Sequence, residues 1–374
     1  MSDVMPLVMP KWGLSMEEGT LTAWLVAEGD DIAKGQEVAE IETTKIANVL
    51  ESPRPGHVRR LVAKVGDTLP VGALLAVLAP ASVPEVDIDA FVAGFVAAAP
   101  AQEGEAAAIA EARFEHAGRP IAYKLAGAGQ EGDPAVLVHG FGGDSDNWLF
   151  NIEALAAGRP VYAIDLPGHG HSTKQLDRGD IDEMASAVLA LLDEAGLGRV
   201  HLVGHSLGAA VALETLARAP GRVASFAGLA PAGLAETVNA DFINAFVAAE
   251  KRRDVKAALQ HLFADPNLVS PAMIEGVQKY KRLEGAREAL AAIAATSLPA
   301  GRQARLYRDL VAEARRPMLV IWGRNDAVLD PAAAEGLPDS VEVLRLDDVG
   351  HMPHMEAAAA VNEALARHFS KVGG

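Results

Sequence analysis

One serine in the chain has the neighbours that an acyl-transferring nucleophile needs. Ser206 lies between the glycines of the stretch GHSLG, residues 204–208, directly after the apolar run RVHLV and before the helix-forming run LGAAVALETLA. A strand that turns sharply into a helix at such a serine displays the hydroxyl above the sheet. The start of the helix then directs backbone amides and a positive dipole toward developing negative charge. The spacing therefore predicts Ser206 as a nucleophile.

Two later residues can activate that serine. Asp326 follows the strand-like run MLVIWG, and His351 follows VEVLRL. A serine hydroxyl is a weak nucleophile unless an imidazole takes its proton and a carboxylate fixes the tautomer of the imidazole. The chain order serine, acid, histidine is found in enzymes whose nucleophile sits on a strand-to-helix turn. We therefore predict Ser206, Asp326 and His351 as the catalytic residues.

Three neighbouring polar residues have other interpretations. His354 stands at the start of the last predicted helix, where packing is the more usual role. Asp330 precedes a proline and resembles a helix cap. Asp165 begins the stretch DLPGHGHS at another strand end and is interpreted as part of a structural turn. His354 and Asp330 remain the alternatives to the predicted histidine and acid.

The stretch VLVHGFGG, residues 136–143, can supply the other half of an oxyanion hole. A glycine-rich bend directly after an apolar strand brings backbone amides near the nucleophile. The predicted donors are the amides of Phe141 and Leu207. His139 is interpreted as orienting this loop and not as a proton carrier.

An internal repeat singles out one lysine near the N-terminus. Residues 15–42 align with residues 52–79 at an offset of 37. The aligned turn residues are Ser15 with Ser52, Gly19 with Gly56, Gly29-Asp30 with Gly66-Asp67, and Gly35 with Gly72. Turn signals between short alternating runs are typical of strands, so two such halves predict a small two-sheet sandwich with approximate two-fold symmetry. The connecting stretch ETTKIAN then forms a hairpin tip that displays Lys45 to solvent, where a lysine can carry a covalent cofactor.

The stretch MPKWGLSMEEGTLTAWLVAEGDDIAKGQEVAEIETTKI resembles the lipoyl domain family. That resemblance implies lipoate attached to Lys45. Biotin carriers share the fold but usually flank the lysine with methionines, whereas Thr44 and Ile46 flank it here. Biotin is therefore the less expected cofactor.

The remaining chain alternates strand-like and helix-like runs, which predicts a mostly parallel sheet with helices on both faces. Residues 113–370 resemble the α/β-hydrolase superfamily. The expected organisation is an all-β lipoyl sandwich at 1–80, an Ala/Pro/Glu-rich linker at 81–112 with a short helix at 86–98, and an α/β-hydrolase domain at 113–374. Residues 231–315 are expected to form a helical cap.

Composition limits the kinds of partner. The net charge is −17 and there are no cysteines. A chain this acidic is a poor ligand for nucleic acid and for anionic membranes. Without cysteine it has no disulfides, thiolate metal ligands or thiol nucleophile, and we expect no metal. We read no signal peptide and no apolar run of the ~18 residues that span a bilayer, so we expect a cytoplasmic location.

The fusion of the two domains suggests a reaction. Lipoyl arms carry acyl groups as thioesters, and a serine–histidine–aspartate site breaks thioesters. The architecture resembles the acetyltransferase components of acetoin dehydrogenase complexes over nearly the whole chain. That resemblance implies transfer of acetyl from S-acetyldihydrolipoyl-Lys45 to coenzyme A as co-substrate, through Ser206. It also implies thiamine-diphosphate-dependent acetoin-cleaving subunits that load the arm and a dihydrolipoyl dehydrogenase that reoxidises it.

Two other functions stay open, and two departures from the wider lipoyl acyltransferases mean that large-cage assembly and the mode of partner binding do not carry over. The chain has no His-x-x-x-Asp-Gly signature and no evident basic subunit-binding domain. One alternative is a thioesterase that releases the acyl group to water. The other is a lipoyl carrier or scaffold whose hydrolase domain is idle.

Overall fold

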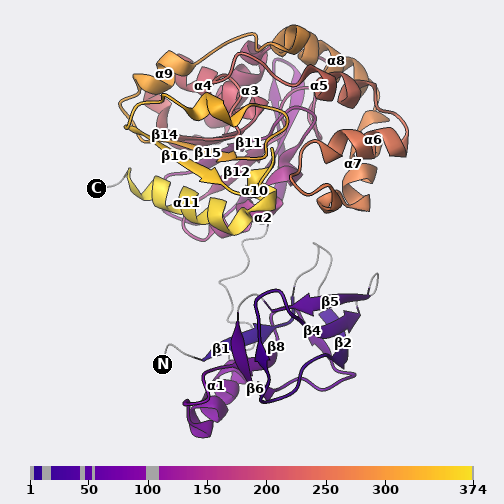
Figure 1. The fold of residues 1–374 in the computed structure, drawn as a ribbon. Coiled ribbons are helices and arrows are strands. Elements are labelled where there is room, and N and C mark those ends of the chain that lie inside the picture. The colour runs from indigo at the N-terminus through magenta and orange to yellow at the C-terminus, as the bar shows by residue number, and fades with distance from the viewer. Residues whose placement is uncertain (1–3, 11–17, 43–46, 53–54, 98–108, 373–374) are drawn as a thin grey trace. The chain divides into compact units, whose positions relative to one another are not determined.

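The computed structural model describes residues 4–10, 18–42, 47–52, 55–97 and 109–372. The chain divides into two compact units, Met1–Ala106 and Ala107–Gly374 (Figure 1). Each unit has its own hydrophobic core.

The first unit is a sandwich of two four-stranded antiparallel sheets, ordered β1-β8-β6-β3 and β5-β4-β2-β7. The strands are β1 (Met5–Val8), β2 (Glu18–Trp24), β3 (Asp31–Ile32), β4 (Glu37–Glu42), β5 (Ala47–Glu51), β6 (Gly56–Leu61), β7 (Thr68–Pro70) and β8 (Leu74–Leu78). Alternate side chains of the strands fill the space between the sheets, as a period of two requires. The predicted sandwich is confirmed.

The predicted two-fold repeat appears in both strand order and turn geometry. The two sheets have equivalent strand orders: β5, β4, β2 and β7 of one sheet correspond, in turn, to β1, β8, β6 and β3 of the other. Gly29 and Gly66 have φ angles of 98° and 96°, a backbone region that glycine enters without strain. In each turn the following aspartate accepts a hydrogen bond of 2.8 Å from the amide three residues before it. The repeated Gly-Asp pair is therefore a repeated turn.

One aligned residue of the repeat, Ser15, lies outside the described residues, but the strands before each half can be compared. The amide of Ser52 donates to the carbonyl of Gln36 at 2.8 Å, and the amide of Met9 donates to the carbonyl of Ala73 at 2.8 Å. Gln36 and Ala73 are 37 positions apart, so β5 and β1 end with the same hydrogen bond in the two halves of the sandwich.

The segment around Lys45 connects two paired strands. β4 and β5 are antiparallel partners from Glu37 opposite Glu51 to Glu42 opposite Ala47. Residues 43–46 join their ends, as the predicted hairpin requires. Lys45 itself lies outside the described residues.

Helix α1 (Glu85–Ala97) lies in the segment expected to be a linker, and it belongs to the first unit. Ile88 is fully buried against Val77 of β8 and its neighbours. Arg59 and Arg60 of β6 both form ion pairs with Glu85. The short helix expected at 86–98 is therefore present, and it is packed on the sandwich.

We propose that the two units are separable, with the division placed after α1. Chains comprising residues 1–97 and 109–374 should each fold when expressed alone, because each keeps its own core. A chain ending at Pro84 should lose stability relative to 1–97, by about 2 kcal/mol from the exposed partners of Ile88. Thermal melts followed by circular dichroism test this. Aggregation of 1–97 or 109–374, or equal stability of the two N-terminal fragments, would contradict it.

The second unit contains an eight-stranded sheet in the order β16-β15-β14-β13-β11-β12-β10-β9. The strands are β9 (Ala110–His116), β10 (Arg119–Ala126), β11 (Ala135–Val138), β12 (Val161–Ile164), β13 (Val200–His205), β14 (Val223–Leu229), β15 (Met318–Gly323) and β16 (Val341–Leu346). β10 pairs antiparallel with both β9 and β12. The six strands β12, β11, β13, β14, β15 and β16 are parallel to one another. The order reverses at β11, and ligands of such sheets bind beyond the carboxyl ends of the strands at that point.

Helices cover both faces of this sheet. α2 (Leu149–Ala156) and α11 (Ala358–Ser370) pack together on one face, and α3 (Ile181–Glu194) and α4 (Leu207–Arg218) pack on the other. The central strands are therefore buried on both sides, which explains their continuous apolar runs. Two short helices, α9 (Arg308–Ala312) and α10 (Pro353–Glu356), flank the last strands. None of the helices in the described part of the chain is long and apolar enough to cross a bilayer.

Besides α9, four α-helices are inserted between β14 and β15: α5 (Ala240–Ala248), α6 (Arg252–Gln260), α7 (Pro271–Lys281) and α8 (Ala286–Ser297). They gather at one side of the unit, at the right and top in Figure 1, within the segment expected as a cap. Lys281 is buried and its ammonium donates to carbonyls at the end of α5, including Ala249 at 3.0 Å. Burial lowers the pKa of Lys281 to about 8.

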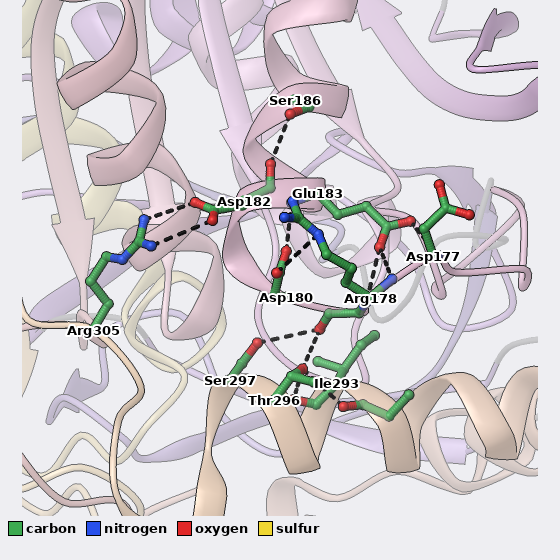
Figure 2. A network of polar contacts seen from close by, with 12 residues as sticks. Asp177, Arg178, Asp180, Asp182, Glu183, Ser186, Ile293, Thr296, Ser297 and Arg305 are labelled. Carbon is green, nitrogen blue, oxygen red and sulfur yellow. Dashed lines mark hydrogen bonds and ion pairs between the residues drawn. The ribbon is translucent and has the colours of Figure 1, made fainter.

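A polar network joins the end of this helical insertion to α3 (Figure 2), and further ion pairs and hydrogen bonds extend it to α4. Arg305 forms ion pairs of 2.8 Å with Asp182 on α3 and 2.6 Å with Glu214 on α4. The Tyr307 hydroxyl donates to Glu214 at 2.9 Å. From α8, the Thr296 hydroxyl donates to the carbonyl of Gly179 at 2.7 Å. The network therefore fixes the insertion to the helix pair beneath it.

Arg305→Ala should lower the free energy of unfolding by about 1 kcal/mol at pH 7, because it removes the shared partner of two carboxylates. Burial raises the pKa of Asp182, but Arg305 and Arg218 outweigh burial and hold that pKa below its usual value. A lowered folded pKa gives stability that is present at neutral pH and lost as the pH falls. Urea unfolding should therefore show the Arg305→Ala difference shrinking below about pH 4. The control is Arg302→Ala, whose pair with Glu236 is largely exposed. A difference that stays constant down to pH 3 would contradict the assignment.

Candidate active site

Ser206 occupies a strained turn between β13 and α4. Its backbone angles are φ 51° and ψ −121°, a region that residues with a side chain rarely adopt. A side chain at Gly204 would lie 2.4 Å from the Ala209 backbone, and one at Gly208 would lie 2.2 Å from the Val138 carbonyl. Only glycine fits at these two positions. The strand-turn-helix arrangement predicted for GHSLG is therefore confirmed.

The two predicted oxyanion donors flank this turn. A side chain at Gly140 would lie 3.1 Å from the Ser206 Cβ, so the loop after β11 lies directly against the serine. Phe141 is the next residue of that loop. Leu207 is the first residue of α4, where helix amides have no partner within the helix.

Asp326 and His351 form a buried pair. His351 Nδ1 donates to Asp326 Oδ2 at 2.8 Å, and both side chains are almost fully buried. The carboxylate also accepts from Trp322 Nε1 at 2.9 Å and from the amides of Val328 and Leu329 at 2.8 and 3.0 Å. Burial would raise the pKa of Asp326, but His351 and the two amides lower it below its usual value. The pair thus holds an ionised carboxylate beside Nδ1 of His351 and fixes the orientation of the ring.

The backbone of His351 is held from two sides. Its amide donates to the carbonyl of Leu262 at 2.8 Å, and its carbonyl accepts from His205 Nε2 at 2.8 Å. The rings of His205 and His351 are 4.9 Å apart. Sequence reasoning missed both contacts, and the only available signal was the place of His205 beside the serine in GHSLG.

The other polar residues have the structural roles that were expected. His354 is fully buried between Trp148 and His205, with ring centroids 4.6 and 4.5 Å away. Asp330 accepts from the amide two residues later and caps a short 3-10 helix. The buried carboxylate of Asp165 accepts the amide of His171 in its own turn and the amide of Ser145, which follows the loop after β11, both at 2.7 Å.

His139 orients the loop after β11, as predicted. Its Nδ1 donates to the carbonyl of Gly140 at 2.8 Å, and its Nε2 accepts from the amide of Leu166 at 3.0 Å. Burial lowers the pKa of His139, so the ring is neutral. Both ring nitrogens are occupied by backbone groups, and neither is free to move a proton.

The helical insertion contacts both loops of the site. The ring of Phe246 on α5 lies 5.9 Å from that of Phe141, and a side chain at Gly142 would meet it at 2.3 Å. Leu262, just after α6, bonds to His351 as described above. The insertion therefore covers the residues around Ser206, and neither contact could be predicted from the residues that make it.

Comparison with known proteins agrees with both halves of the chain. The family model described as alpha/beta hydrolase fold matches residues 133–358, and the one described as biotin-requiring enzyme matches residues 6–78. Among solved structures, a meta-cleavage product hydrolase (CumD) has a TM-score of 0.62 at 20% identity, covering 70% of this chain and 98% of that one. A bacterial membrane phospholipase A has a TM-score of 0.63 at 24% identity, covering 77% and 96%. These structures show the fold of the second unit.

Two curated relatives span the full length. A dihydrolipoyllysine-residue acetyltransferase component of an acetoin cleaving system from Pseudomonas putida is 48% identical over 373 residues, covering 99% of this chain and 100% of the relative. A protein of the same description from Cupriavidus necator is 43% identical over 366 residues, covering 98% and 97%. The sandwich, the hydrolase fold and the identity over both units lead to one conclusion: the chain belongs to the family of dihydrolipoyllysine-residue acetyltransferase components of acetoin cleaving systems.

Proposed function

We propose that the chain moves an acetyl group from S-acetyldihydrolipoyl-Lys45 to coenzyme A through an acetyl-Ser206 intermediate. The observation that supports this most is the buried pair of His351 and Asp326, in the same unit as the strained turn of Ser206. The two full-length relatives carry the acetyltransferase description. Nucleophile, base and orienting acid are thus all supplied by one unit of the chain.

His351 and Ser206 perform the first half of the reaction. His351 Nε2 takes the proton of the Ser206 hydroxyl as Oγ attacks the thioester carbonyl. The amides of Phe141 and Leu207 stabilise the oxyanion of the tetrahedral adduct. The carbon–sulfur bond then breaks, and His351 returns the proton to the leaving thiolate. Ser206 is left acetylated.

The second half uses the same groups in reverse. His351 takes the proton from the thiol of coenzyme A, and the thiolate attacks the acetyl-serine. The carbon–oxygen bond to Ser206 breaks, and His351 gives the proton back to Oγ. Burial of His351 and the cover provided by Phe246 limit water at the site, which favours transfer over hydrolysis.

Lipoate on Lys45 would supply the thiol that carries the acetyl group as a thioester. The fit of this chain to the cofactor rests on the sandwich and on the match of residues 6–78 to the biotin and lipoyl carrier family. The paired ends of β4 and β5 at Glu42 and Ala47 place residues 43–46 at a connection between strands. The protein-derived part of the cofactor site is Lys45 itself.

The partners follow from the description of the relatives as components of a cleaving system. We infer that thiamine-diphosphate-dependent acetoin-cleaving subunits load the arm and that a dihydrolipoyl dehydrogenase reoxidises it. A cytoplasmic location fits this role and a chain without cysteine.

The test is acetyl release from the purified, acetyl-loaded full-length chain with and without coenzyme A. We expect acetyl-coenzyme A to form, and the acetyl group to be retained much longer when coenzyme A is left out. Equal release to water under both conditions would indicate a thioesterase. Retention under both conditions would indicate a carrier with an idle hydrolase unit.

A further inference from the structure

Coenzyme A and this chain are both negatively charged. The acceptor carries a pyrophosphate and a further phosphate on its nucleotide, while the chain has a net charge of −17. A polyanion is repelled by a strongly acidic protein unless cations are gathered where it binds. A binding site for coenzyme A, which rests on the proposed function, therefore needs exposed cations next to the residues around Ser206.

Such cations lie along the outer face of α6. Val255, Ala258 and Leu259 of this helix are buried, so the opposite face points to solvent. Exposed on or just before the helix are four cations, Lys251, Arg252, Arg253 and Lys256. Arg252 and Lys256 are four residues apart and so are neighbours on one helix face. They form a cationic strip.

The cations of the strip are available to a ligand. Arg252 lies 3.7 Å from Glu275, and Arg253 lies 3.2 Å from Asp254. Both pairs are exposed, and exposed pairs contribute little stability. For Lys251 and Lys256 no ion pair is found in the described part of the chain. Asp254 is the only carboxylate within α6 itself.

The strip leads to the residues around His351. Shortly after α6 ends at Gln260, the carbonyl of Leu262 accepts the amide of His351. A side chain at Gly350 would lie 2.6 Å from the amide nitrogen of Ala264, so this segment is packed tightly on the histidine loop. At a rise of 1.5 Å per residue, Lys256 and Arg252 lie roughly 6 and 12 Å along α6 from its end at Gln260, two residues before Leu262. In coenzyme A a long pantetheine arm likewise separates the thiol from the phosphates.

We propose that the cationic strip of α6 binds the nucleotide phosphates of coenzyme A while the thiol reaches Ser206. Arg252, Arg253 and Lys256 supply the charge, and Leu262 connects the strip to the catalytic histidine. The acetyl-loaded arm needs no such contact, because it carries no phosphate.

A second group of cations lies at the wrong end of the sheet. Arg199, Arg315, Arg316 and Lys371 line a surface hollow. Arg199 and Arg316 lie one and two residues before β13 and β15, whereas Ser206 and Asp326 follow the same two strands. Strands of six residues span about 20 Å, so this hollow lies at the opposite edge from the nucleophile. Its cations provide a matched control.

The experiment compares two triple variants of the lipoylated full-length chain. The first is Arg252→Gln/Arg253→Gln/Lys256→Gln, and the control is Arg199→Gln/Arg315→Gln/Lys371→Gln. Binding of coenzyme A is measured by calorimetry at low and moderate salt. The KM of transfer is measured for coenzyme A, 3′-dephospho-coenzyme A and pantetheine. Adenosine 3′,5′-bisphosphate serves as a competitor that has phosphates but no thiol.

We expect the α6 variant to weaken binding of coenzyme A about tenfold and to reduce its salt dependence. Its KM for 3′-dephospho-coenzyme A should rise less, and its KM for pantetheine should stay the same. The control variant should match the unmodified chain. The bisphosphate should compete with coenzyme A in the unmodified chain and not with pantetheine.

Several results would overturn the proposal. Unchanged binding of coenzyme A by the α6 variant would do so, as would no binding by the unmodified chain. An equal rise of KM for coenzyme A and pantetheine would indicate a structural defect and no phosphate site. The two proposals fail separately. If coenzyme A binding depends on α6 but no acetyl group is transferred, only the proposed function is refuted. If acetyl is transferred and the KM for coenzyme A is unchanged in the α6 variant, only the phosphate site is refuted.

Discussion

Ser206→Ala should reduce acetyl transfer from acetyldihydrolipoamide to coenzyme A by several orders of magnitude and leave the fold intact. Loss of the nucleophile removes the covalent route, because no other described hydroxyl occupies the turn between β13 and α4. Alanine meets the same backbone strain as serine at φ 51°, so the free energy of unfolding should change by less than about 1 kcal/mol. The matched control is the exposed Ser340→Ala. Transfer rates and urea unfolding are measured on the same preparations.

The remaining catalytic residues should behave as a unit with Ser206. His351→Ala should cost about as much as Ser206→Ala, and the double variant should be little slower than either. Asp326→Asn should cost less in rate, because the acid only orients and supports His351. Asp326→Asn should also lower the free energy of unfolding by about 1–3 kcal/mol. The new amide nitrogen would face N–H donors whose hydrogen bonds the carboxylate now accepts.

The pattern of rates separates two chemical routes. If His351 deprotonates coenzyme A for direct attack on the thioester, Ser206→Ala is mild and His351→Ala is severe. Near-normal transfer by Ser206→Ala would therefore exclude the acetyl-serine. Near-normal transfer by both alanine variants would leave only the carrier with an idle hydrolase unit.

Lys45→Arg should abolish lipoylation and, with it, transfer within the assembled system. Arginine keeps the positive charge but lacks the amine that forms the amide bond to lipoate. Intact mass should show one lipoyl addition on the unmodified chain, mapping to Lys45, and none on the variant. Acetyl transfer from free acetyldihydrolipoamide should remain within about twofold of normal, because the hydrolase unit is a separate compact unit.

The exposed Lys64→Arg is the matched control in the same unit and should be lipoylated normally. The protein is produced in a host that lipoylates a known carrier domain. An unmodified Lys45 under those conditions, or a lipoyl addition that persists in Lys45→Arg, would refute the assignment.

Local sequence determined the turns and the order of the catalytic residues. Gly29 and Gly66 could be read as turns because a left-handed backbone position favours glycine whatever lies around it. Ser206 could be read as a nucleophile because the glycines two positions away on each side are required by the turn itself. Asp326 and His351 followed from strand ends, because carboxyl ends of parallel strands meet at one edge of a sheet. In each case the physical cause lies within a few residues of the position.

Contacts between distant segments were decided only by the tertiary structure. The Ala/Pro/Glu-rich composition around α1 did not reveal that Ile88 packs on Val77. Nothing near His351 in the chain indicates that Leu262 and His205 hold its backbone. These contacts join residues tens to more than a hundred positions apart, and their free energy depends on surfaces that exist only once both segments have folded.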